Sequence, residues 1–200
     1  MSRPGRSFYE RRSPTVAREL LGCQLVRVID GGRLSGSVVE TEAYRGQWDP
    51  ASHAFRGRTE RNAVMFGQAG HAYVYFTMGM HHCLNITTEQ EGTAGAVLLR
   101  ALEPLEGLES MKRNRGPVDL HRIASGPGNL TEALGVDGAL NGEDMVRSSE
   151  LFVEQGKYLG EVGVSTRVGV TAGKTFEWRF YAKGNPFVSK GKPALPSKNP

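Results

Sequence analysis

Cysteine is scarce in this chain, which carries only Cys23 and Cys83 among its 200 residues. Two cysteines cannot form a disulfide framework, and free thiols fit a reducing compartment. No stretch approaches the roughly 20 apolar residues that a membrane-spanning helix needs. The basic start, residues 1–6, leads into no apolar segment, which argues against a secretory signal. We therefore expect a cytoplasmic protein with no membrane partner.

Motifs for several chemistries are missing as well. The chain has no Gly-x-Ser-x-Gly elbow and no Walker sequence. His81, His82 and Cys83 are neighbours, but successive strand residues point to opposite faces, so only two of them could share an ion. A cysteine beside a histidine in sequence is also not the spatial dyad of thiol catalysis. We expect no metal, no cofactor and no covalent nucleophile.

Length and composition indicate one globular unit. The apolar share is 38% and the charged share 23%, as in soluble proteins with a packed core. A chain of 200 residues can bury such a core without disulfides or structural metal. We expect a single domain over residues 1–200, with flexible ends at residues 1–12 and 190–200.

The charge balance favours a polyanionic partner. The net charge is +4 and the pI about 9.2. Basic residues cluster at Arg3, Arg6, Arg11 and Arg12, at Lys112, Arg113, Arg115 and Arg122, and at Lys183, Lys190, Lys192 and Lys198. Residues 143–161 are acidic instead. This separation predicts one positive and one negative face, as in nucleic-acid-binding proteins, although solvated charges without a partner explain it equally well.

Local patterns predict short helices and mostly antiparallel strands. A proline in the first turn and a closing glycine mark a helix over residues 13–22, with further helices at 106–113 and 130–135. Strands are expected at residues 23–29, 33–44, 73–77, 83–88, 96–101 and 178–181, and residues 151–153, 162–164 and 167–170 are further short apolar runs. Residues 30–32 close the first hairpin. The fold class is α+β, a single compact domain with a curved, mainly antiparallel sheet and short surrounding helices.

Residues 126–129 form a glycine-rich segment before an expected helix. Backbone amides at a helix start can bind an anion, but a plain turn is the favoured interpretation here. The polar loop at residues 45–70 is long, and such loops are usually functional or disordered.

Two acidic residues, Glu40 and Glu42, alternate along an apolar strand and therefore share one face. Acids in this position are solvated at a sheet edge, paired, or used in chemistry. We favour a function for at least one, because the chain supplies further parts of a site: Tyr44, His53, Tyr75 and Arg100. A carboxylate beside a guanidinium can accept a proton from water, which predicts a general base.

Tyrosines on the expected strands suit a flat ligand. Tyr73 and Tyr75 alternate and should face the same way, with Tyr44 nearby. Core aromatics are the usual alternative, but the basic loops favour stacking on a nucleobase, which gains a cation–π term of about 1 kcal/mol when the base is cationic. His53 lies in a polar loop, where histidines are more often bystanders.

Several separated blocks share one order with a known family. They are VETEAY at residues 39–44, Arg61-Asn62 with Met65-Phe66, YVY at 73–75 with Gly79-Met80, Asn85-Ile86, LLRALEPLEG at 98–107 and SGP at 125–127. Together they resemble the alkyladenine (3-methyladenine) DNA glycosylase family, the mixed α/β type rather than the helix-hairpin-helix type. The match runs from about residue 13 to about residue 189.

The resemblance implies a monofunctional DNA glycosylase of base excision repair. Such an enzyme flips a damaged purine (3-methyladenine, 7-methylguanine or hypoxanthine) out of duplex DNA, hydrolyses its N-glycosidic bond and leaves an abasic site. It needs no metal or cofactor, and its partner is double-stranded DNA that contains damaged purines. We expect a monomer.

Individual positions match the family's site. The resemblance makes Glu42 the catalytic base and Arg100 the residue that holds this carboxylate and its water. The base pocket would comprise Tyr44, His53, Tyr75, Asn85 and Leu98, with Asn85 disfavouring purines that carry a 2-amino group.

The expected DNA-contacting residues lie in two segments. Met78, with Met80 beside it, stands where better-known members insert a tyrosine into the duplex. A thioether can wedge between base steps but stacks less well than an aromatic ring, which predicts a less persistent flipped state. Arg56, Arg58 and Arg61 are candidates for phosphate contacts.

Two alternatives stay open at this stage. A nucleic-acid-binding module without catalysis would use the basic residues and tyrosines but not Glu42. A nucleoside N-glycosidase would need neither basic surfaces nor Met78.

Overall fold

The structure is a computed structural model that describes residues 2–77, 79–191 and 193. Met78, the expected wedge residue, lies outside the described residues. Most of residues 190–200, the end that was expected to be flexible, lie outside them as well. Strand β2 (Gly32–Tyr44) is the longest element and the one on which the sheet is built. It forms an antiparallel hairpin with β1 (Gln24–Ile29). Asp30 and Gly31 adopt positive φ angles of 51° and 72° in the connecting turn, which confirms the predicted reversal.

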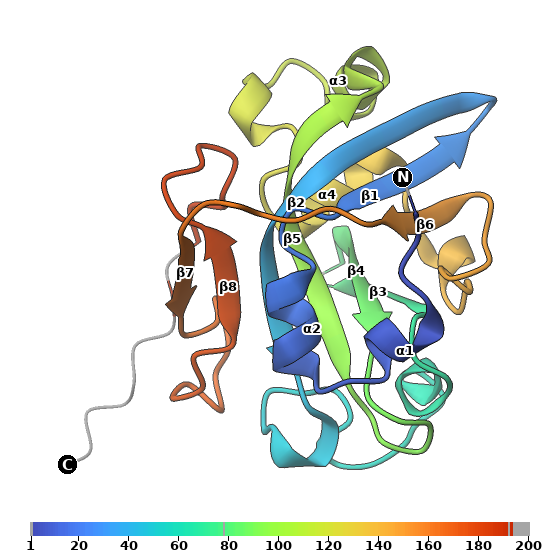
Figure 1. Ribbon diagram of the computed structural model, residues 1–200, viewed down its shortest axis with the longest axis vertical. Helices are drawn as coiled ribbons and strands as arrows, with labels where there is room; N and C mark the ends of the chain where they lie inside the picture. The colour runs from blue at the N-terminus through green and yellow to red at the C-terminus, as the bar shows by residue number, and fades with distance from the viewer. Residues whose placement is uncertain (1, 78, 192, 194–200) are drawn as a thin grey trace.

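One antiparallel sheet contains all eight strands of the described chain. The main order is β3 (Ala72–Thr77), β4 (His81–Thr87), β5 (Ala96–Glu106), β2, β1 and β6 (Leu151–Glu154). Strand β8 (Arg179–Ala182) pairs with the second half of β2 and carries β7 (Val162–Ser165) beyond it. Figure 1 shows the sheet curling, with β7 and β8 on one side and β3 and β4 on the other. The predicted α+β class with a curved antiparallel sheet is confirmed.

Short helices surround this sheet. They are α1 (Arg6–Tyr9), α2 (Ser13–Glu19), α3 (Leu108–Arg115) and α4 (Pro127–Leu134), with single 3-10 turns at Gly46–Trp48, Ala63–Phe66, Leu120–Arg122 and Gly138–Leu140. Helix α2 buries Val16 and Ala17 completely, and Leu20, directly after its end, is fully buried as well. The hydroxyl of Thr41 on β2 donates to the Ala17 carbonyl at 2.8 Å. This helix thus closes the core over the strand that carries the two acids.

One local prediction was wrong. Helix α4 begins at Pro127, so residues 127–129 form its first turn, where proline is well tolerated. The apolar run at residues 167–170 forms a loop, in which Val168 makes an isolated bridge to Pro193. The Val168 amide donates to a side chain instead of a strand ladder.

The N-terminal segment packs on the domain, unlike the loose start expected from the sequence. Tyr9 is fully buried, and Arg6 forms an ion pair with Asp144 at 2.6 Å. Arg27 and Arg33 pair with Glu150 and Glu154. Basic residues therefore neutralise part of the acidic stretch at residues 143–161, and the expected separation into a positive and a negative face is wrong for this region.

The described helices are all too short or too polar to cross a lipid bilayer.

Candidate active site

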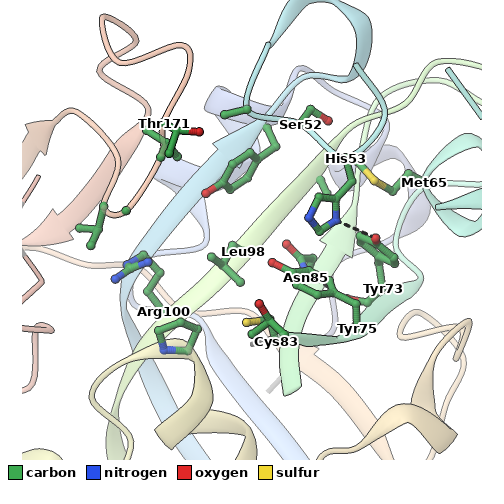
Figure 2. A pocket seen from close by; sticks show the side chains of 18 of the residues that line it. Ser52, His53, Met65, Tyr73, Tyr75, Cys83, Asn85, Leu98, Arg100 and Thr171 are labelled. Atoms are coloured by element: carbon green, nitrogen blue, oxygen red, sulfur yellow. Dashed lines mark hydrogen bonds between the residues drawn. The ribbon is translucent and has the colours of Figure 1, made fainter. Parts of the chain in front are cut away.

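A cavity of about 530 Å³ opens beside the second half of β2. Its volume lies within the range of small-molecule sites. Its walls come from the loop after β2, from β3, β4 and β5, and from the loop between β7 and β8. The lining includes Tyr44, Pro50, Ala51, Ser52, His53, Met65, Tyr73, Tyr75, Cys83, Asn85, Leu98, Arg100, Val168, Gly169, Val170 and Thr171. Figure 2 shows His53, Tyr73, Tyr75, Asn85 and Leu98 gathered around one hollow, with Arg100 and Thr171 on its other side.

Glu42 lies directly behind the cavity wall and is fully buried. Its Oε2 accepts hydrogen bonds from the Tyr44 hydroxyl at 2.9 Å and from Arg100 Nη1 at 3.4 Å. Its Oε1 accepts from the Val168 amide at 2.7 Å. All three donors belong to residues that line the cavity. The carboxylate is thus held by both oxygens at the edge of the hollow rather than in bulk solvent.

The Tyr44 phenol is the donor in its hydrogen bond to Glu42. Burial, followed by the nearby Glu42 charge, raises the pKa of Tyr44 well above its ordinary value. The protonated hydroxyl therefore persists at neutral pH and keeps its hydrogen bond to Glu42.

Glu40, the second acid on this face, anchors Arg100. Arg100 Nε donates to Glu40 Oε1 at 2.8 Å, and Arg179 Nε donates to the same oxygen at 2.7 Å. Ser189 adds its amide to Oε2 at 2.7 Å. Burial alone would raise the pKa of Glu40, but Arg100 and Arg179 outweigh it and lower the pKa. The two acids therefore differ in role, since Glu40 orients the guanidinium and Glu42 lies at the cavity.

Sheet register explains how distant residues reach one site. Glu42 on β2 is opposite Leu98 on β5, and Leu98 is opposite Asn85 on β4. Three adjacent strands thus present these side chains in one row. The Asn85 amide nitrogen donates to the Tyr73 carbonyl at 3.0 Å, which fixes the side chain in the cavity wall.

An aromatic cluster forms the wall on the β3 side. Tyr73 and Tyr75 both line the cavity, as their alternation predicted, and their ring centroids are 5.3 Å apart. The His53 ring lies 4.5 Å from Tyr75, and its Nδ1 lies 2.9 Å from the Tyr73 hydroxyl. Burial and then the Arg61 charge lower the pKa of His53, which favours a neutral imidazole. His53 therefore lines the cavity together with the two tyrosines.

The candidate DNA contacts lie outside this cluster. Met80 is 64% exposed in the β3–β4 turn. Arg56 and Arg58 are exposed in the loop after β2. Arg61 is exposed too, but its guanidinium packs over the Tyr75 ring with its carbon 5.4 Å from the centroid. This contact gives Arg61 a place beside the aromatic wall that the sequence did not indicate.

Sequence reasoning missed a fully buried ion pair next to the site. Arg167 Nη1 and Nη2 donate to the two carboxylate oxygens of Asp49 at 2.5 and 2.7 Å. The Arg167 guanidinium also lies over the Tyr44 ring, 4.6 Å from its centroid. The pair spans 118 positions along the chain, so no local pattern could have revealed it.

Within the described residues, no group of three or more His, Cys, Asp or Glu side chains could hold a metal ion. His81 is exposed, whereas Cys83 is buried in the cavity wall.

The fold places a buried carboxylate beside a hollow with aromatic walls, an arrangement that suits an enzyme acting on a flat base. Comparison with known proteins agrees. The profile of the methylpurine-DNA glycosylase family matches residues 7–186, and the chain belongs to this family. It is a DNA glycosylase, a hydrolase of N-glycosyl bonds that acts in DNA repair.

Three relatives illustrate the similarity, each provisionally named a 3-methyladenine DNA glycosylase. The protein of Carboxydothermus hydrogenoformans is 50% identical over 92% of this chain and 97% of its own length. The protein of Methanocella arvoryzae is 50% identical over 94% of this chain and 96% of its own length. That of Chlorobaculum parvum is 44% identical over 99% and 96%.

Proposed function

We propose that this DNA glycosylase removes alkylated or deaminated purines of the 3-methyladenine, 7-methylguanine and hypoxanthine class from double-stranded DNA. The damaged nucleotide flips into the cavity, and hydrolysis of its N-glycosidic bond leaves an abasic site. The proposal is supported above all by Glu42, whose carboxylate is held by Tyr44, Arg100 and Val168 at the cavity edge.

Glu42 acts as the base in the proposed mechanism. Cleavage of the glycosidic bond develops positive charge on the sugar, which a nearby carboxylate stabilises. Glu42 orients a water molecule and takes its proton while the oxygen attacks the anomeric carbon and the bond to the base breaks. An alkylated purine carries positive charge itself and leaves without much acid assistance. The protein forms no covalent bond to the sugar, so the DNA strand stays intact.

The cavity walls account for base selection. Tyr44 and Tyr75 stack on the flat purine, and a cationic base gains an additional cation–π attraction. Asn85, fixed by its bond to the Tyr73 carbonyl, opposes purines that carry a 2-amino group. Normal guanine carries such a group without the positive charge that favours 7-methylguanine, and it is therefore disfavoured.

Outside the cavity, we place Met78 and Met80 at the gap that the flipped nucleotide leaves. The exposed Met80 suits an apolar wedge between base steps. Arg56 and Arg58, with Arg61 beside Tyr75, would contact phosphates. The protein would act as a monomer.

The test replaces Glu42 by glutamine and measures free base released from alkylated duplex DNA under single-turnover conditions. Because the amide keeps the shape but cannot accept the proton, we expect excision to fall by a factor of about 100 to 10,000 with duplex binding retained. Glu109→Gln, on the surface of α3 with its side chain 75% exposed, is the matched control. Near-normal excision by Glu42→Gln would disprove the assignment. Equal activity on free nucleosides would indicate a nucleoside N-glycosidase instead.

A further inference from the structure

The Asp49–Arg167 pair joins two loops that both line the cavity. Asp49 follows β2 and precedes the wall residues Pro50, Ala51 and Ser52. Arg167 follows β7 and precedes the wall residues Val168, Gly169, Val170 and Thr171. Both side chains of the pair are completely inaccessible to solvent. A bond between these two loops therefore sets the distance between two walls of the hollow.

Arg167 also contacts the end of β2 that carries Glu42, the proposed base. Its Nη1 donates to the carbonyl oxygen of Ala43, between Glu42 and Tyr44, at 2.9 Å. Its guanidinium carbon lies 4.6 Å from the centroid of the Tyr44 ring. The Arg167 side chain thus contacts both the Ala43 backbone, between Glu42 and Tyr44, and the Tyr44 ring.

The same arginine determines where the amide that binds Glu42 points. The peptide bond between Arg167 and Val168 supplies the N–H that donates to Glu42 Oε1 at 2.7 Å. Because the Arg167 side chain is fixed to Asp49 at 2.5 and 2.7 Å, its backbone has little freedom to shift. Asp49 is held in turn, since its Oδ1 accepts from the Ala51 amide at 3.1 Å.

We propose that Asp49 and Arg167 are positioning residues for excision, which rests on the function proposed above. Neither touches the substrate. They hold the Val168 amide and the Tyr44 ring in the arrangement that orients the Glu42 carboxylate. Stability alone is a poor explanation for such a pair, because a buried ion pair can often be replaced by neutral side chains without loss of stability.

The first test removes both charges. In the double variant Asp49→Asn, Arg167→Met, the asparagine keeps an acceptor for the Ala51 amide and methionine fills much of the arginine volume. A misplacement of about 1 Å at a catalytic group can cost a factor of 100. We expect single-turnover excision to fall about 100-fold, with the Kd for lesion duplex within threefold of wild type and a cooperative thermal transition retained.

Asp144→Asn is the matched control for this experiment. Asp144 accepts from Arg6 at 2.6 Å and from the Val146 amide at 3.1 Å, so it repeats the hydrogen bonds of Asp49 in a partly exposed pair that lines no part of the cavity. We expect excision within twofold of wild type. A folded double variant that excises within threefold of wild type would overturn the proposal, and so would an equal loss in Asp144→Asn.

A second, milder variant decides the matter if the double variant does not fold. Gly173 has a φ of +59°, and a Cβ there would lie 3.0 Å from Arg167 Nη2 and 3.1 Å from Asp49 Oδ1. The added methyl group of Gly173→Ala therefore displaces the side chains of Arg167 and Asp49. Gly184 has a similar φ of +78° with nothing within 4 Å of its Cβ, so Gly184→Ala carries the backbone strain alone. We expect at least a fivefold loss of excision rate for Gly173→Ala and less than twofold for Gly184→Ala.

The two proposals fail in different ways. A wild-type protein that releases no base from any alkylated or deaminated duplex refutes the proposed function. A wild-type protein that releases base, while Gly173→Ala matches Gly184→Ala in rate, refutes the positioning role alone.

Discussion

The two halves of β2 place their charges in different environments. Residue Arg33, near the start, pairs with Glu106 and Glu154 while its side chain stays 33% exposed. Near the end, Glu40 and Glu42 share Arg100, and the exposed fractions of these side chains are 0%, 0% and 7%. Exposed pairs contribute about 0–1 kcal/mol, whereas breaking a buried pair costs several times more. One strand thus carries an exposed ion pair in its first half and buried ion pairs, which are costly to break, in its second half. The cavity lies beside the second half.

The largest expected effect comes from the guanidinium that joins the two acids. Arg100→Met leaves Glu42 and Glu40 short of a buried counter-charge, so we expect a loss of about 3–5 kcal/mol in the free energy of unfolding. Urea denaturation followed by circular dichroism measures it. A loss below 1 kcal/mol would mean that the buried ion pairs contribute no more to stability than the exposed ones.

Acid should act on the buried half through Glu40. Because its pKa is lower in the folded state than the ordinary value of 4.5, its carboxylate stabilises the fold fully above about pH 4.5. This contribution is lost as the pH falls from there through the lower folded-state pKa. Thermal unfolding from pH 6 to pH 3 should therefore show a shallower acid-side loss in Glu40→Gln than in wild type. Parallel curves for the two proteins would contradict the assignment.

A moderate effect is expected at the aromatic wall. Tyr75→Ala removes a stacking surface, which typically costs about 1–3 kcal/mol per base, while Tyr75→Phe keeps the ring. Equilibrium binding to lesion duplex should weaken about 5- to 150-fold for alanine and much less for phenylalanine. Equal weakening by both variants would assign the contribution to the hydroxyl rather than the ring.

The smallest effect is expected at an exposed pair. Arg11 and Glu19 lie 2.8 Å apart with side chains 39% and 48% exposed. Glu19→Gln should cost less than about 1 kcal/mol in the free energy of unfolding and leave excision unchanged. A larger loss would contradict the expectation that exposed ion pairs contribute much less to stability than buried ones.

Local patterns predicted the parts of the site that lie on strands. Alternation placed Glu40 and Glu42 on one face and brought Tyr73 to the side of Tyr75, and the hairpin turn at Asp30 was plain from its residue types. The family resemblance added Asn85 and Leu98, and the register between β2, β5 and β4 brings these residues to Glu42.

The remaining parts of the site depend on contacts between distant segments. Arg179 reaches Glu40 across 139 positions, and Val168 reaches Glu42 across 126. Val168 lies in a short apolar run, and nothing in that run shows that its amide binds a carboxylate. An apolar run indicates burial but does not identify the partner of a backbone amide.

The central position of β2 has a consequence for motion. Residues Glu40, Thr41 and Glu42 pair with β5 on one edge and with β8 on the other. Backbone amides bonded within such a strand exchange with solvent deuterium only when much of the domain opens. We expect these three amides to be among the slowest in the protein. The strand beneath the cavity would then stay still while a bulky nucleotide enters.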